Sequence, residues 1–260
     1  MPSLREQPSI AAVERLMTRT GAVDITVVIP TLNEAGNIGE LVRRARAMLD
    51  GMGVSHEILA IDGGSTDGTC EEAEQAGAVA IREGGHTYGA ALRTGFAHAR
   101  GEFIITMDSD LSHEPEFFEQ LWQARRRADI VIASRYVAGG KADMAPFRSV
   151  LSRILNFVYT RILRIPVHDI SSGFRLYRRA VMERTETTAH DFDVLEEVLI
   201  KLYVQGHAVA EVPFHYRPRK HGRSHAKLVR FALAYLKTLW RMARLRYGTA
   251  GGRDARERRP

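Results

Sequence analysis

Two aspartates, Asp108 and Asp110, directly follow the apolar segment 103–107, which the sequence predicts to be a β-strand. Carboxylates two positions apart at the end of a strand can both approach one cation. Hard oxygen ligands of this type suit Mg²⁺ or Mn²⁺, which often also holds substrate phosphates. The pair therefore predicts a metal site that neutralises charge on a leaving diphosphate. Alternatively, Asp108 and Asp110 are loop carboxylates exposed to solvent. The acidic residues at the ends of other strands favour the metal site.

Acidic residues also end two further predicted strands. Asp62 could accept hydrogen bonds from a ribose or a base edge, or it could be a turn residue or a helix cap before Thr66. The same two interpretations apply to Glu34. Asn33, just before it, could equally be a helix N-cap.

The first half of the chain predicts the strands and helices that would position these residues. Short apolar segments alternate with segments of helical periodicity, which is typical of an α/β fold with parallel strands. In such sheets ligands bind beyond the carboxyl ends of the strands. We expect strands at 25–29, 57–61, 78–82, 103–107 and 129–133, and helices at 36–49, 66–76, 88–99 and 115–126.

The second half is less regular. It predicts helices at 147–163 and 194–204, a polar turn at 169–173 between them, a strand at 208–213 and a basic loop at 217–225. We expect a polar leader (1–22), one main domain (23–225), an amphipathic helix (226–247) and a disordered basic tail (248–260).

The formal net charge of +6 hides a strong asymmetry. Residues 216–260 carry 14 Lys and Arg but only 2 Asp and Glu, so the remainder has a net charge of −6. Such a basic region is expected to bind an anionic partner.

The single cysteine, Cys70, excludes an internal disulfide and a cysteine-rich zinc site. Because no apolar stretch approaches the roughly 18 residues of a spanning helix, and residues 1–20 lack a secretory core, we expect the cytosol or the cytoplasmic side of a membrane.

The predicted helix 226–247 is basic and amphipathic. Its apolar side chains form one stripe, and such a helix suits the headgroup layer of an anionic membrane. The same pattern fits a helix that packs its apolar stripe onto the domain. Nucleic acid is the other anionic partner to consider, and the acidic main domain argues against it. The basic stripe consists of Lys227, Arg230, Lys237, Arg241 and Arg244.

Several motifs resemble those of one enzyme family. Four segments are similar to the nucleotide-sugar half of inverting GT-A glycosyltransferases: Ile29-Pro-Thr-Leu-Asn-Glu34, Asp62-Gly-Gly-Ser-Thr-Asp-Gly68, Tyr88-Gly-Ala-Ala-Leu-Arg-x-Gly-Phe96 and Asp108-x-Asp110. Three more resemble dolichol-phosphate mannose synthases: Ser134-Arg-Tyr136, Arg148-x-x-x-Ser152-x-x-x-Asn156 and Asp169-x-x-Ser-Gly-Phe-Arg-x-Tyr177. The likeness runs from about residue 25 to residue 240 and implies a GT-A catalytic domain over 23–225.

The resemblance implies roles for individual residues. Asp108 and Asp110 would bind Mg²⁺ or Mn²⁺, and Asp110 and Arg219 would act in catalysis, with Arg219 bridging phosphates across the reaction centre. Guanidinium groups fit phosphate oxygens well, and the phosphate of a lipid acceptor would be held by Arg135, Arg148 and Ser152. The nucleotide sugar would contact Pro30, Thr31, Asn33, Glu34, Asp62 and Asp108.

By this resemblance the chain transfers a sugar, most simply mannose from GDP-mannose, to a polyprenyl or dolichyl monophosphate with inversion. Gly63 stands where the family often has a second aspartate, and His225 where it often has lysine. A UDP-sugar donor such as UDP-glucose, or a saccharide hydroxyl as acceptor, therefore stays open. A hydroxyl acceptor needs a general base, for which Glu197 is the best candidate; otherwise Glu197 is an ordinary helix-surface carboxylate.

Two other classes of protein fit the sequence less well. The Asp108-x-Asp110 pair argues against a non-catalytic GT-A domain. The lack of a glycine-rich phosphate loop after the first strand argues against a nucleotidyltransferase. Members of the resembling family often continue into transmembrane helices, so we expect this chain to bind a membrane peripherally or through a separate membrane subunit.

Overall fold

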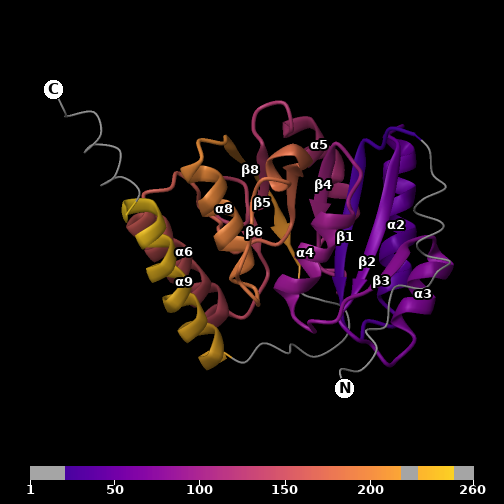
Figure 1. Ribbon diagram of the computed structural model, residues 1–260, viewed down its shortest axis with the longest axis horizontal. Coiled ribbons are helices and arrows are strands. Elements are labelled where there is room, and N and C mark those ends of the chain that lie inside the picture. The colour runs from indigo at the N-terminus through magenta and orange to yellow at the C-terminus, as the bar shows by residue number, and fades with distance from the viewer. Residues whose placement is uncertain (1–20, 218–227, 249–260) are drawn as a thin grey trace, which may run out of the picture.

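Strands and helices alternate along the first half of the chain, as its hydrophobic pattern predicts (Figure 1). The structure is a computed structural model that describes residues 21–217 and 228–248. The expected leader, Arg219, His225 and the basic tail lie outside these described residues.

Seven strands form the main sheet, in the order β3-β2-β1-β4-β7-β5-β8. Neighbouring strands are parallel except around β7, which runs antiparallel to both β4 and β5. The expected parallel strands are confirmed, but the sequence did not predict β7, which makes the sheet mixed. A separate parallel ribbon pairs β6 (Lys141–Ala142) with β9 (His215–Tyr216). The main strands are β1 (Ile25–Thr31), β2 (His56–Asp62), β3 (Val79–Arg82), β4 (Phe103–Thr106), β5 (Ile130–Ser134), β7 (Arg175–Arg178) and β8 (Val209–Pro213).

Helices cover both faces of the sheet, and each face has its own hydrophobic core. In β1, Val27 faces one core and Val28 the other, because successive side chains of a strand point to opposite faces. All of β1 is buried, as expected for a central strand covered on both sides. The helices are α2 (Ile38–Gly51), α3 (Thr69–Ala76), α4 (Tyr88–His98), η1 (Pro115–Phe117), α5 (Phe118–Ala124), α6 (Pro146–Leu163), α7 (Arg179–Met182), α8 (Val194–Val204) and α9 (Leu228–Gly248).

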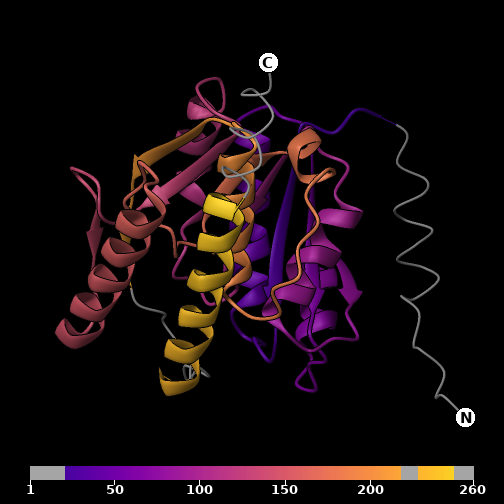
Figure 2. The ribbon, with the colours of Figure 1, turned by 60° about the vertical axis from the view of Figure 1, so that its left-hand side comes forward.

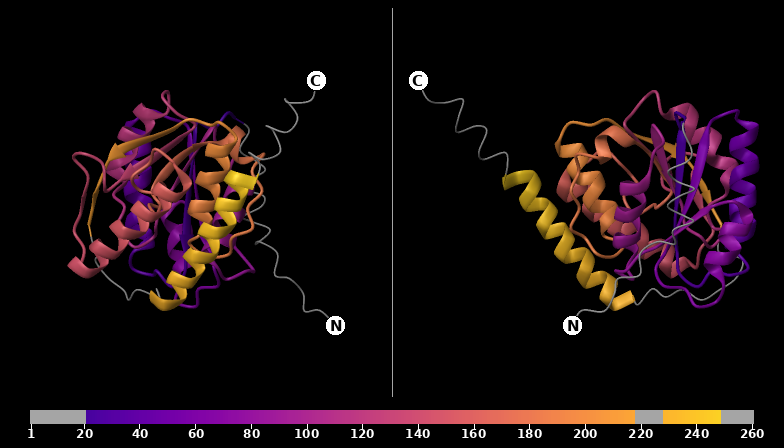
Figure 3. Two further views of the ribbon diagram at one scale, coloured as in Figure 1. Left: turned by 90° about the vertical axis from the view of Figure 1, so that its left-hand side faces the viewer. Right: turned by 45° about the vertical axis from the view of Figure 1, so that its right-hand side comes forward.

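Helices α6 and α9 run side by side at the opposite end of the molecule from α2 and α3 (Figures 1 and 2). In the described part of α9, Leu239 and Met242 are buried in the core cluster that includes α8. Arg241 reaches Asp193 at 3.8 Å and Glu197 at 3.4 Å. This part of α9 therefore packs its apolar stripe onto the domain, the second of the two arrangements that the sequence left open. Figure 3 shows the course of the helix along the domain.

Candidate active site

The carboxyl ends of β1, β2 and β4 meet at one edge of the sheet and bring the predicted acidic residues to it. Thr31 at the end of β1 is the register partner of Asp62 at the end of β2. On the other side of β1, β4 runs parallel and ends just before Asp108. The expected nucleotide and metal residues thus share one edge, because parallel strands end in the same direction.

Asp108 and Asp110 follow β4 closely. Asp110 is buried and accepts a hydrogen bond from the Ser112 amide at 3.1 Å. The Ser112 hydroxyl is also buried, and within the described part of the chain it makes no hydrogen bond. Desolvation by the surrounding protein, together with the nearby Asp110 carboxylate, raises the pKa of Asp108. His113 acts in the opposite direction. Repelling carboxylates beside an unpaired hydroxyl form a site that a cation would stabilise.

Two aromatic residues hold Asp108 in place: Tyr88, which begins one of the motifs but was assigned no role, and His113, which no motif includes. The Tyr88 hydroxyl donates to Asp108 Oδ1 at 3.3 Å, and the Asp108 amide donates to His113 Nδ1 at 2.9 Å. His113 Nε2 then carries the proton and faces Asp108 Oδ2 at 3.8 Å. The His113 ring is buried and stacks on Phe174. Its only signal in the sequence is its position five residues after Asp108.

The donor set fits a magnesium-type cation that shares its ligands with a substrate. Among residues 21–217 and 228–248, no three His, Cys, Asp or Glu side chains gather to hold a metal. Two carboxylates are therefore what the described chain offers. Mg²⁺ is commonly bound by one or two carboxylates, with water and substrate phosphates as its other ligands.

The expected nucleotide residues come together in two touching loops, after β1 and after β2. Asp62 accepts hydrogen bonds from the Gly64 and Ser65 amides, and Asn33 Oδ1 accepts from the Thr66 amide at 3.1 Å. Asp62 thus acts as a turn residue, one of its two interpretations. The helix N-cap considered for Asn33 is wrong, because α2 begins at Ile38 with Asn37 at its N-cap position, and Asn33 instead links the two loops. The remaining members behave similarly: the Thr31 hydroxyl donates to the Ile61 carbonyl, Glu34 accepts from Asn37, and Pro30 is buried within β1.

Motifs expected to hold the acceptor phosphate also assemble. Arg135 donates to both oxygens of Asp169, at 2.7 and 2.6 Å, and Tyr136 donates to Ser152 at 2.7 Å. Burial alone would raise the pKa of Asp169, but the ion pair and hydrogen bonds with Arg135 hold it below its usual value. Arg148 lies on α6 one turn before Ser152; its side chain, like Arg219, is outside what the structure describes.

The turn 169–173 joins this cluster to the aspartate pair. At its start Asp169 binds Arg135; at its end the Gly173 carbonyl accepts from the Thr106 hydroxyl at 2.7 Å. A Cβ at Gly173 would lie 2.9 Å from the Tyr88 hydroxyl and 3.3 Å from Asp108 Oδ1. The glycine thus allows a close approach, and the turn connects the two groups of predicted residues.

Glu197 is not an exposed residue of α8, and structural partners already engage its carboxylate. Its carboxylate is buried and accepts from the Thr188 and Ala189 amides at 3.0 and 2.6 Å. It also pairs with Lys201 at 2.8 Å and with Arg241. Burial opposes ionisation, but these partners keep its pKa below the usual value. The expectation of a helix-surface carboxylate is therefore wrong, and Glu197 clamps segment 188–189 between α8 and α9.

We expect Glu197→Gln to lower the free energy of unfolding by about 2 kcal/mol. The reason is that the backbone amides of segment 188–189 and the side chains of Lys201 and Arg241 lose a charged partner. Sugar transfer per folded molecule should change little. Urea unfolding and a transfer assay on the folded fraction measure both, with the exposed Glu119→Gln as control. A large fall in kcat at unchanged stability would instead identify Glu197 as a base.

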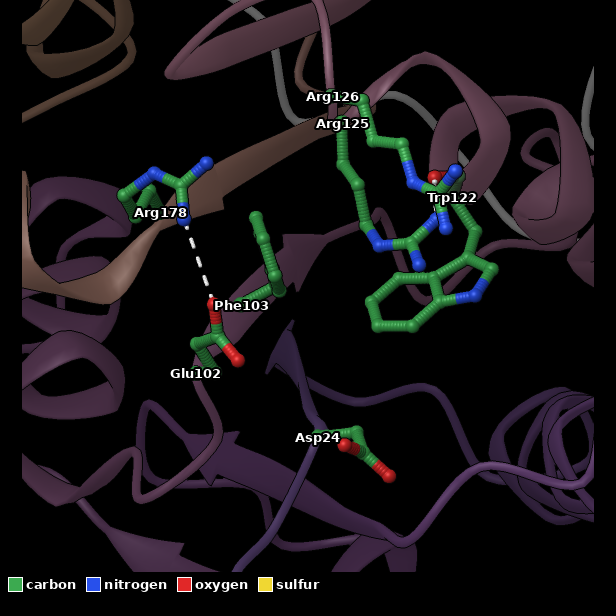
Figure 4. Close-up of a pocket in the computed structure, with 7 residues that line it drawn as sticks. All are labelled: Asp24, Glu102, Phe103, Trp122, Arg125, Arg126 and Arg178. Carbon is green, nitrogen blue, oxygen red and sulfur yellow. Dashed lines mark hydrogen bonds and ion pairs between the residues drawn. The ribbon is translucent and has the colours of Figure 1, made fainter.

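A cavity of about 290 Å³ lies at the other edge of the sheet, near the starts of β1 and β4 (Figure 4). Arg125 lies over the Trp122 ring, and Arg178 pairs with Glu102. None of the predicted site residues lines it, so it is separate from the candidate active site. Its lining consists of Asp24, Glu102, Phe103, Trp122, Arg125, Arg126 and Arg178.

The sequence is similar to those of known glycosyltransferases. The sequence profile of glycosyl transferase family 2 matches residues 26–185. Dolichol-phosphate mannosyltransferase of Pyrococcus furiosus is 34% identical over 227 residues, 84% of this chain. Undecaprenyl-phosphate 4-deoxy-4-formamido-L-arabinose transferase of Salmonella paratyphi A is 29% identical over 213 residues, 79% of this chain. The chain spans 63% of the length of each of these curated relatives.

Solved structures share the fold. Glucosyl-3-phosphoglycerate synthase from Mycobacterium tuberculosis, in complex with Mn²⁺, UDP and phosphoglyceric acid, superimposes with a TM-score of 0.68 at 21% identity. The match covers 92% of this chain and 84% of that one. At this level of identity the likeness establishes the α/β architecture of a GT-A glycosyltransferase, as expected from the sequence.

Proposed function

Because this chain belongs to glycosyl transferase family 2, we propose that it transfers a sugar from a nucleotide sugar to a polyprenyl monophosphate, with inversion. The observation that carries this proposal is that turn 169–173 connects two groups of residues. Asp108 and Asp110, carboxylates suited to a cation, lie at its end, and the cluster of Arg135 and Ser152 lies at its start. The names of two curated relatives, both lipid-phosphate sugar transferases, support the acceptor.

The residues divide the chemistry between them. Asp108 and Asp110 would hold Mg²⁺ or Mn²⁺, which would neutralise charge on the leaving diphosphate. Arg135, Arg148, Ser152 and Arg219 would bind the acceptor phosphate and direct it at the anomeric carbon from the face opposite the leaving group. A phosphate acceptor is already anionic near neutral pH and needs no general base. The engagement of Glu197 in structural contacts supports such an acceptor.

The donor is the less constrained part of the proposal. GDP-mannose is the first choice because a relative is named a mannosyltransferase, and a UDP-sugar is the second because the similar solved enzymes bind UDP. Screening GDP- and UDP-sugars with one polyprenyl phosphate and Mg²⁺ or Mn²⁺ tests both. Lipid-linked product from one donor is expected. Transfer to a saccharide hydroxyl, without lipid product, would contradict the proposed acceptor.

We propose that the protein reaches its acceptor by binding an anionic membrane surface peripherally, on the cytoplasmic side, through α6. Large apolar side chains of α6 face outward; Phe147 is 69% and Phe157 67% exposed. The helix has no acidic residue, and Arg153 and Arg161 are exposed beside this face. Basic side chains near anionic lipid contribute about 1 kcal/mol each. The exposed apolar residues of α6 are Phe147, Val150, Leu151, Ile154, Phe157, Val158 and Ile162.

None of the helices in the described residues is long and apolar enough to cross a membrane. The expected role of the C-terminal helix changes accordingly. Because α9 packs Leu239 and Met242 inward, α6 offers the larger exposed apolar face among the side chains that the structure describes.

We expect Phe157→Glu to weaken binding to anionic vesicles by about tenfold or more, since burying a phenylalanine contributes about 1.5–3 kcal/mol. Vesicle flotation at low and high salt measures the bound fraction. The control is Gln75→Glu, which adds the same charge on exposed α3 at the far end of the sheet. Equal binding by both variants would contradict docking through α6. Failure of the unaltered protein to bind any vesicle would favour a separate membrane subunit.

A further inference from the structure

Residues 86–88, at the end of the loop after β3 and the start of α4, contact groups on both sides of the end of β1. His86 Nδ1 lies 2.6 Å from the Gly63 carbonyl, just beyond β2. Two residues later, the Tyr88 hydroxyl reaches Asp108, just beyond β4. Because β2 and β4 flank β1 and neighbouring strands lie about 4.8 Å apart, these contacts are about 10 Å apart along the sheet edge. A ligand with its phosphates at Asp108 would extend toward His86.

The hydrogen bond of His86 determines which ring nitrogen carries the proton. A carbonyl oxygen only accepts, so Nδ1 must donate to Gly63 and Nε2 of the neutral ring is left as an acceptor. Within the described residues, Nε2 makes no hydrogen bond, and the side chain is exposed. This acceptor is therefore available to a ligand.

The backbone around His86 is unusual as well. His86 has φ +52°, a left-handed conformation that residues other than glycine seldom adopt. Its ring lies over Gly64, where a Cβ would come within 2.8 Å of Nδ1. Strained residues of this kind persist where the surrounding structure requires them, and they gather at binding sites.

Other polar side chains nearby are already used by the loops themselves. Asp62 accepts from two amides of its own turn, and Asn33 Oδ1 accepts from the Thr66 amide. Gly63 contributes no side chain where the resembling family often has a carboxylate. Leu32 is 42% exposed and lies beside Gly63, so it offers an apolar surface against which a flat ring could pack.

We infer that His86 is a specificity-determining residue that reads the base of the donor nucleotide, with Nε2 accepting a hydrogen bond from a ring N–H. This inference rests on the proposed function. Uracil and guanine carry a ring N–H on the Watson–Crick edge, whereas cytosine and adenine present a ring acceptor there. A lone acceptor therefore favours UDP and GDP over CDP and ADP, and it does not separate UDP from GDP.

Two substitutions separate the two nitrogens of His86. His86→Asn keeps a donor near Nδ1 for the Gly63 carbonyl and tolerates the left-handed backbone, but it lacks the distal acceptor. His86→Gln keeps an acceptor near the position of Nε2. The probes are UDP, GDP, CDP and ADP, titrated calorimetrically with Mn²⁺ at about pH 8, where free imidazole is neutral.

Wild-type protein should bind UDP or GDP more tightly than CDP and ADP. His86→Asn should weaken the favoured nucleotide by about tenfold, the loss of one hydrogen bond, without weakening the others. His86→Gln should recover part of this loss. Wild-type selectivity in His86→Asn, or an equal loss for all four nucleotides, overturns the inference while the proposed function stands. If wild type binds none of the four, the proposed function fails and the inference with it.

Discussion

Replacing Asp110 with asparagine is expected to reduce sugar transfer by about 10³-fold, or roughly 4 kcal/mol of activation free energy, while the fold survives. The Asp110 carboxylate is buried beside Asp108 and the unpaired Ser112 hydroxyl. An asparagine amide oxygen could still accept from the Ser112 amide, which Asp110 now does at 3.1 Å. It could not supply the second negative charge that a divalent ion needs.

The measurement is transfer from a radiolabelled nucleotide sugar to short polyprenyl phosphate, together with calorimetric titration of Mn²⁺. The matched control, Asp50→Asn, removes a largely exposed carboxylate from α2 and should leave both readouts unchanged. Full activity of Asp110→Asn would overturn the metal site. Lost transfer with unchanged Mn²⁺ affinity would assign Asp110 a role other than metal binding.

Much of the scaffold was predictable because it depends on local patterns. Apolar segments such as 25–29 and 103–107 end in polar residues, and both are strands whose ends meet at the candidate site. The α/β architecture and the glycosyltransferase family inferred from the motifs are confirmed. The assignments of individual residues to nucleotide, metal and acceptor remain predictions, now with a geometry to test.

Strand β7 was not predictable because its stability depends on distant partners. Arg175, at its start, is fully buried, although arginine usually marks a surface. Its guanidinium donates to the carbonyls of Ser172, Ile170 and Leu195, the last of them on α8. Those carbonyls become available only once the chain has folded, so a sequence pattern cannot reveal them.

The contacts that surround the predicted site residues were hidden for the same reason. Tyr88 lies twenty residues before Asp108 in the sequence, and Glu197 binds segment 188–189 through backbone amides that carry no residue signature. The packing of α9 was ambiguous because an amphipathic stripe fits a membrane and a protein core equally well. Only the burial of Leu239 and Met242 distinguishes the two.

Asp169→Asn should lower the free energy of unfolding by about 3–5 kcal/mol, because it leaves the Arg135 guanidinium enclosed without its counter-charge. Asp169 is fully buried and Arg135 nearly so, and their bonds are short and bidentate. The control is Asp143→Asn. Asp143 pairs with Lys141 and His215 at the surface, where the loss should stay below about 1 kcal/mol. Equal effects of the two substitutions on urea unfolding would contradict a structural role for the buried pair.

The acid dependence of unfolding gives an independent check on the same pair. Arg135 holds the pKa of Asp169 below its usual value, so the stabilisation is complete above about pH 5, where the carboxylate is ionised in both states. It is lost as the pH falls through the lower pKa of the folded state, because protonation then favours the unfolded chain. Wild-type stability should therefore decline below about pH 5 more steeply than that of Asp169→Asn. Parallel declines would show that Arg135 does not depress the pKa of Asp169.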